Sequence, residues 1–252
     1  MDRKELIRSL DKMCDCITEV SSEMPFIIFD YYIRVEESKD KRPFYNLIAE
    51  SYKTINAVCY LLRSDSYIQA SYMLKSAIEE VAMTYVLSNN RTMLLEYIKL
   101  LGEKYKYSQM DDIDKKLYRD NRRITSKVDQ FFDYGWIRDW ANGKYGIAQI
   151  VEQAKLDELI PELKDLLNPP AYGSVETHPF TSEQEKENKE EYWINLISYT
   201  CKIFDFLCST YKKFIGKEEF RKLPVYSLLI DFKDIYLKVF NYPDLYLNKW
   251  KL

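Results

Sequence analysis

The sequence predicts an all-α protein, a single irregular helical bundle of about 8–10 helices around a central apolar helix at residues 66–87. Three observations lead to this fold class. Helix breakers are scarce, with 6 glycines and 8 prolines in 252 residues, which favours long helices. Apolar residues recur at helical spacing along most of the chain. Residues 66–87 are apolar around most of the helix circumference, which is typical of a helix packed on several sides.

In the first half of the chain, prolines and capping residues mark where helices begin. Pro25 and Pro43 are each expected at the first position of a helix, because proline suits the first turn. The short connection Ser64-Asp65-Ser66 supplies an N-cap to the central helix. Because it is short, the helix expected at 43–63 and the central helix should be antiparallel neighbours. The helices expected here cover residues 3–21, 25–38, 43–63, 66–87 and 91–106, with another starting at Asp111-Asp112.

The second half alternates helices with two irregular stretches. Residues 134–146 hold three of the six glycines and are expected to form a loop, and residues 168–182 are the strongest cluster of helix breakers. Gly216 is expected to end a long helix, and the tail at 241–252 is aromatic and basic. The helices expected here cover residues 147–155, 157–167, 192–215 and 224–240. No linker forces a boundary, so residues 1–252 are expected to form one domain.

Charge and cysteine content narrow the class of protein. The net charge is −3 at pH 7, which provides no overall attraction to nucleic acid or to an anionic membrane. The first residues lack the apolar segment of a signal peptide, and no apolar run is long enough to cross a bilayer. The five cysteines are odd in number and mostly lie on apolar helix faces. We therefore expect free thiols, no disulfides, no membrane contact and a cytoplasmic location.

Two stretches hold the candidate catalytic residues. Lys75 and Glu79 lie one turn apart at the edge of the apolar face of the central helix. His178, the only histidine, is a candidate general base because its ordinary pKa lies near neutrality, and Ser174 would share its face in a helical turn. Tyr172 precedes them. In the competing interpretation, the 168–182 segment is a buried polar turn, and Lys75 with Glu79 is an ordinary pair at the edge of the bundle.

The sequence contains no pattern typical of a metal or cofactor site. Cys14 and Cys16 have the wrong spacing for a zinc site, and one histidine cannot supply the ligands of zinc or di-iron centres. No glycine-rich phosphate loop occurs. We expect no metal and no cofactor. Trp136 and Trp140, together with residues 169–180, are candidates for lining a small-molecule site.

Two motifs resemble a poorly characterised bacterial family of all-helical proteins. The central helix of that family reads Leu-Leu-Arg-Ser-x-x-Glu, and residues 73–79 read Met-Leu-Lys-Ser-Ala-Ile-Glu, with Lys75 in the arginine position. The family's later Tyr-x-x-x-Ser-x-x-x-His motif resembles Ser174-x-x-x-His178, with Tyr172 displaced. The chain more remotely resembles helical toxin and phage-defence (HEPN-like) nucleases, although no arginine lies four to six residues before His178.

Three functions remain open from the sequence. The first is a non-enzymatic binding or regulatory protein of a bacterial defence or stress system, with a protein partner or a second copy as its target. The alternative is a metal-independent ribonuclease-like effector in which His178 acts with Lys75, Glu79 and Tyr172 on RNA. The third is a small-molecule-binding protein that uses Trp136 and Trp140.

Overall fold

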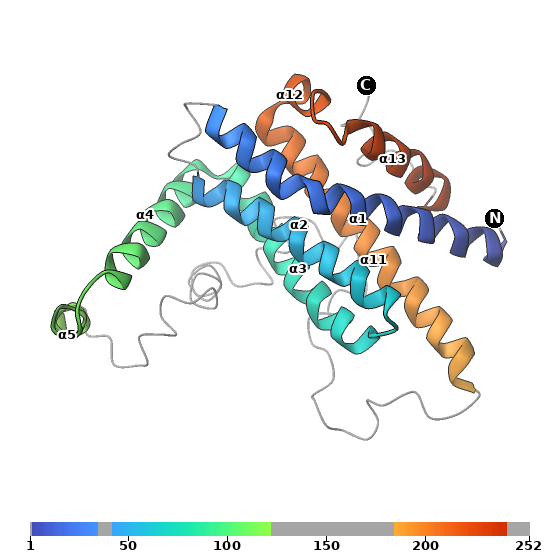
Figure 1. Cartoon of the computed structure of the whole chain (residues 1–252), viewed down its shortest axis with the longest axis horizontal. Helices are drawn as coiled ribbons and strands as arrows, with labels where there is room; N and C mark the ends of the chain where they lie inside the picture. The colour runs from blue at the N-terminus through green and yellow to red at the C-terminus, as the bar shows by residue number, and fades with distance from the viewer. Residues whose placement is uncertain (1, 35–41, 122–183, 241–252) are drawn as a thin grey trace.

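Every secondary-structure element in the described residues is an α-helix (Figure 1), which confirms the predicted all-α class. The computed structural model describes residues 2–34, 42–121 and 184–240. Its helices are α1 (Arg3–Arg34), α2 (Arg42–Arg63), α3 (Tyr67–Asn89), α4 (Arg91–Ser108), α5 (Asp112–Asn121), α11 (Gln184–Ile215), α12 (Lys217–Arg221) and α13 (Tyr226–Phe240). The predicted loops at 134–146 and 168–182 and the predicted tail at 241–252 lie outside the described residues.

The first helix corrects the sequence prediction. Residues 3–34 form one continuous helix with Pro25 inside it, whereas the sequence predicts a break before Pro25. The proline has no amide hydrogen to donate to the carbonyl of Ser21, which normally weakens a helix. Met24 and Ile28 are buried on either side of it, so packing of this turn against the core offsets the missing hydrogen bond.

Helices α1, α2 and α3 lie side by side in antiparallel order, and α11 crosses behind them (Figure 1). Their inward side chains form one continuous core with α13. Tyr52 of α2 is fully buried, and its ring lies 6.1 Å from that of Phe204 of α11. Phe204 in turn lies 4.9 Å from Phe232 of α13. Edge-to-face aromatic contacts of this kind join the antiparallel layer to the C-terminal helices.

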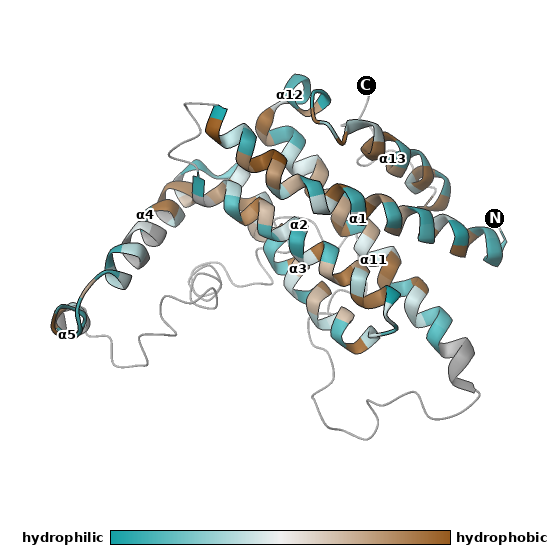
Figure 2. Cartoon of the chain, viewed as in Figure 1, coloured by the Kyte–Doolittle hydropathy of each residue, from teal (hydrophilic) through white to brown (hydrophobic). Residues whose placement is uncertain are grey.

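The central helix is buried as predicted. Leu74, Ala77, Ile78 and Val81 of α3 have no exposed surface, which agrees with the apolar stripe in the sequence. Helix α2 shares the central position, because it packs on α1, α3 and α11. Figure 2 shows several hydrophobic residues in the C-terminal half of α1, and three of them, Phe26, Phe29 and Ile33, are exposed.

Helix ends follow the expected capping chemistry at Asn90 and Gly216 but not at Ser66. The side chain of Asn90 accepts a hydrogen bond from the amide of Met93 at 3.1 Å, at the start of α4. Gly216 ends α11 with a φ of 91°, in the left-handed region where glycine is favoured. Ser66 occupies the N-cap of α3, but its side chain makes no cap hydrogen bond. The predicted last helix at 224–240 begins at Tyr226 and is preceded by the short α12.

Helices α4 and α5 extend away from the bundle (Figure 1). Within the described residues, no helix is long and apolar enough to cross a membrane. All five cysteines are free thiols, as the sequence predicts.

Candidate functional site

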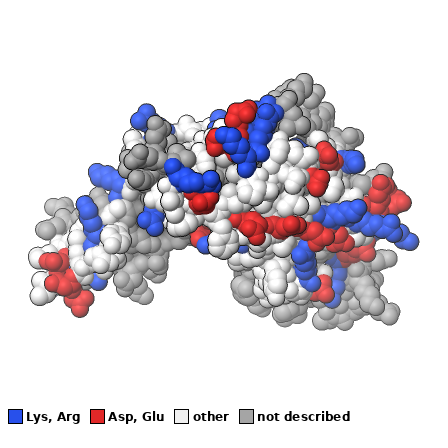
Figure 3. Space-filling model, turned by 45° about the horizontal axis from the view of Figure 1, so that its top comes forward, with Lys and Arg blue, Asp and Glu red and all other residues white. Residues whose placement is uncertain are grey.

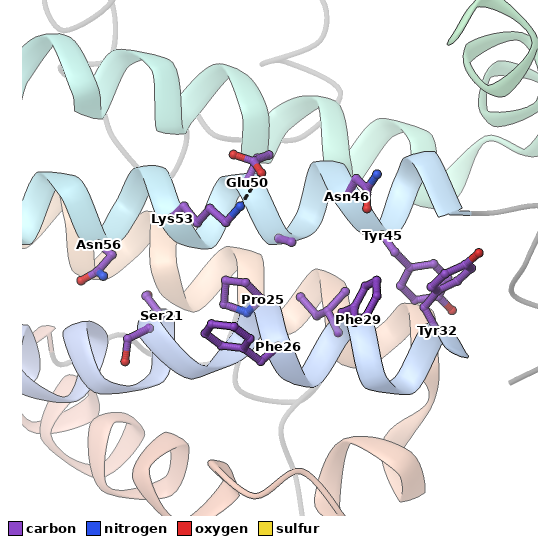
Figure 4. Close-up of a pocket in the computed structure, with 13 residues that line it drawn as sticks. Ser21, Pro25, Phe26, Phe29, Tyr32, Tyr45, Asn46, Glu50, Lys53 and Asn56 are labelled. Atoms are coloured by element: carbon purple, nitrogen blue, oxygen red, sulfur yellow. Dashed lines mark hydrogen bonds and ion pairs between the residues drawn. The ribbon is translucent and has the colours of Figure 1, made fainter. Parts of the chain in front are cut away.

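A trough runs along the bundle surface between α1 and α2 (Figure 4). Thirteen residues, which lie between positions 21 and 32 on α1 and between positions 45 and 56 on α2, line it, and its volume is about 680 Å³. Because the two helices are antiparallel, Ser21 lies opposite Asn56 at one end, and Tyr32 lies opposite Tyr45 at the other. We call this feature the α1–α2 trough.

Aromatic side chains dominate one end of the α1–α2 trough. Phe26 is 74% exposed and Phe29 is 53% exposed, so α1 presents large apolar groups to solvent from a helix whose opposite face is in the core. The ring of Tyr32 lies 6.4 Å from Phe29 and 6.1 Å from Tyr45. The guanidinium of Arg42 lies 5.7 Å from the centre of the Tyr32 ring, a cation–π distance.

Polar side chains lie along the α2 side of the α1–α2 trough. The ammonium of Lys53 lies 2.7 Å from Oε1 of Glu50 one turn away, and both side chains are exposed. Ala49 contributes only a methyl group between Asn46 and Glu50. On the α1 side, the hydroxyl of Ser21 is buried and has no hydrogen-bond partner. The trough therefore combines an aromatic end with a polar side whose two charges neutralise each other.

An acidic stripe continues along α1 on the same outward face. Asp11, Asp15, Glu19 and Glu23 recur every four residues and are exposed, so they lie in one row along the helix. Figure 3 shows a row of acidic side chains across the middle of the molecule. Arg63 pairs with Asp15, whereas no salt bridge between described residues includes Glu19 or Glu23. Residues 13–33 hold four acidic residues and no lysine or arginine.

A second cluster lies behind the trough, between α2 and α3. Glu80 of α3 is only 8% exposed, and burial raises the pKa of its carboxyl group to about 7. The Thr54 hydroxyl forms a hydrogen bond with this carboxylate and lowers its pKa, while the nearby charges of Glu50 and Glu79 raise it. One oxygen, Oε2, has no hydrogen-bond partner. The carboxyl group of Glu80 therefore titrates near neutral pH.

Asp205 and Lys233 form a buried ion pair that joins α11 to α13. Their charged atoms are 2.7 Å apart, and the ammonium also lies 4.8 Å from the ring centre of Tyr236. Burial raises the pKa of Asp205, and the Lys233 charge opposes that increase. Because both groups are buried and in direct contact, this ion pair connects α11 to α13 inside the protein.

The structure describes only part of the catalytic site that the sequence suggests. Lys75 is half-buried and Glu79 is buried on α3. His178, Ser174, Tyr172, Trp136 and Trp140 lie outside the described residues, so their approach to Lys75 and Glu79 stays a prediction. The described residues hold no group of three or more side chains suited to a metal ion.

Neither Glu80 nor the trough is predicted from the sequence. The sequence does contain a signal for the trough, since Phe26, Phe29 and Ile33 follow helical spacing on a face distinct from that of Met24 and Ile28. Comparison with known proteins finds no matching family model, no matching curated protein and no matching solved structure.

Proposed function

We propose that this chain is a non-catalytic binding protein, a regulatory component of the cytoplasm that receives a protein partner in the α1–α2 trough. One observation carries the proposal. Phe26 and Phe29, which line the trough, project from a helix whose opposite face lies in the core. Ile33 (56% exposed) lies one turn beyond Phe29, outside the lining of the trough. A contiguous exposed apolar surface rimmed by polar groups is characteristic of interaction sites.

The exposure of the aromatic rings favours a protein over a small molecule. Small-molecule sites enclose most of the ligand surface, whereas Phe26 and Phe29 each keep more than half of their surface in solvent. Exposed phenylalanine and tyrosine side chains are enriched at protein interfaces, where a partner covers them. Burying such rings would supply much of the binding free energy.

The chemistry of the trough supports binding rather than catalysis. Among the described residues that line it, the charged side chains are Glu50 and Lys53, and each neutralises the other at 2.7 Å. A catalytic acid or nucleophile requires a partner that shifts its reactivity at a site that substrate can reach. The strongly shifted carboxyl of Glu80 lies buried behind the trough, between α2 and α3.

Affinity capture with a matched control tests the proposal. Wild type, Phe26→Asp with Phe29→Asp, and Tyr105→Asp would be used as bait in bacterial lysate, and bound proteins identified by mass spectrometry. Tyr105 is a suitable control because it is 68% exposed on α4, away from the trough. We expect specific proteins to bind wild type and the Tyr105 variant but not the double variant. If no bound protein distinguishes the double variant from the control, the proposal is wrong.

A further inference from the structure

The shape of the α1–α2 trough fits one class of partner. Its walls run from residue 21 to 32 on α1 and from 56 to 45 on α2, which corresponds to about 16 Å at a rise of 1.5 Å per residue. That length matches about three turns of a helix. Two antiparallel helices side by side leave a straight groove that accepts the side-chain ridge of a third helix.

The apolar groups of the trough are spaced to receive a helical ridge. Phe26 and Phe29 line the trough one turn apart on α1, and Ile33 continues their row just beyond it. Ala49 leaves space on the α2 side because its side chain is one methyl group. A partner helix with apolar residues at i, i+3 or i+4, and i+7 would place them along this line, as in other helix-in-groove complexes.

The surrounding charges select the sign of the partner. Glu19 and Glu23 precede Phe26 on the outward face of α1, and no salt bridge between described residues neutralises them. Arg34 is the only basic residue of α1 beyond Lys12, and it pairs with Asp30. The Glu19 and Glu23 carboxylates therefore give a negative charge to the α1 side near the Ser21 end of the trough, whereas the Arg42 guanidinium lies at the opposite, Tyr32 end. Complementary charge favours lysine or arginine on the facing flank of a partner, whereas a phosphate-rich membrane surface would be repelled.

We propose that the α1–α2 trough binds an amphipathic helix of about three turns, which inserts its apolar ridge beside Phe26 and Phe29 and directs a basic flank toward Glu19 and Glu23. This inference rests on the proposed function and specifies the partner of the same site.

Two helical peptides of about fourteen residues test it, with identical leucine positions and either lysine or glutamate on the flank. Binding to the full chain would be followed by fluorescence anisotropy. We expect the lysine peptide to bind about tenfold more tightly than the glutamate peptide at low salt, with a smaller preference at high salt. Phe26→Ser should weaken binding of the lysine peptide about tenfold, because it removes an exposed apolar anchor.

Charge variants separate the two parts of the proposal. Glu19→Gln with Glu23→Gln should reduce the preference for the lysine peptide to about threefold or less. Asp112→Asn with Asp114→Asn on α5 neutralises the same number of carboxylates and should leave the preference unchanged. Circular dichroism would verify that each variant is folded.

Several results would overturn the inference. Equal binding of both peptides would show that the trough does not select a basic partner. Phe26-dependent binding to anionic vesicles would show that the trough binds a membrane surface instead. Phe26-dependent dimerisation in sedimentation would make a second copy the occupant. If neither peptide binds in a Phe26-dependent way while lysate proteins still do, the helix inference fails and the proposed function stands. Loss of both kinds of binding refutes both.

Discussion

Replacing Glu80 with glutamine should abolish one large pH dependence of stability. The folded protein holds the carboxyl proton up to about pH 7, whereas 4.5 is the ordinary pKa of the group. This group therefore contributes its full stability below its unfolded pKa and loses it as the pH rises through the folded pKa. Glutamine resembles the protonated carboxyl in shape and stays neutral at every pH.

The expected size follows from the two pKa values. A change from 4.5 to about 7 corresponds to roughly 3 kcal/mol, at about 1.4 kcal/mol for each tenfold change in proton affinity. The free energy of unfolding of Glu80→Gln minus that of wild type should thus rise by about this amount between about pH 4 and about pH 8. Taking the difference removes the contribution of every group that titrates alike in both proteins.

Urea unfolding followed by circular dichroism across this pH range provides the measurement. Glu23→Gln, an exposed residue on α1, is the matched control and should differ from wild type by a few tenths of a kcal/mol at all pH values. Thr54→Val should move the midpoint to higher pH, because Thr54 favours the ionised carboxyl. A difference between Glu80→Gln and wild type that stays constant across the range would show that burial does not raise the pKa of Glu80.

Three further outcomes are expected. Lys233→Met should cost about 3–5 kcal/mol in urea unfolding, since Asp205 would stay buried without its partner; the double replacement with Asp205→Leu should cost less, and an equal loss would show that the pair has no special role. Gly216→Ala should cost about 1 kcal/mol, because its φ of 91° strains any residue with a Cβ, although no atom lies within 4 Å of the added methyl; an unchanged melting temperature would contradict this. Wild type and His178→Ala should leave an RNA substrate equally intact on gels, and cleavage that depends on His178 would favour the ribonuclease hypothesis.

The helices were largely predictable because their spacing and caps are local properties. The break predicted at Pro25 was wrong. The sequence shows that a proline removes a local hydrogen bond, but it does not show that distant helices bury Met24 and Ile28 beside it. Helix α11 begins at Gln184, before the predicted start at Tyr192. Its first turns are rich in glutamate and lysine, which are good helix formers in solvent even without an apolar stripe.

The candidate site was less predictable because it depends on which helices become neighbours. Lys75 and Glu79 could be singled out from the edge of an apolar stripe. The role of Glu80 requires knowing that α2 brings Thr54 and Glu50 against that part of α3. The trough likewise exists only because α1 and α2 lie side by side with Ala49 between larger residues. The spacing of Phe26, Phe29 and Ile33 indicates a second apolar face on α1, but it does not indicate which helix lies beside that face.

The contact between α2 and α11 sets an order for folding during synthesis. The hydroxyl of Tyr52 meets the thiol of Cys208, which lies 156 positions later in the chain. A ribosome needs roughly 8–30 s to make that stretch at about 5–20 residues per second. The hairpins of α1, α2 and α3 can form meanwhile, but the aromatic surface around Tyr52 stays exposed to solvent until α11 leaves the ribosome. Transiently exposed hydrophobic surface of this kind favours aggregation of a nascent chain during such an interval.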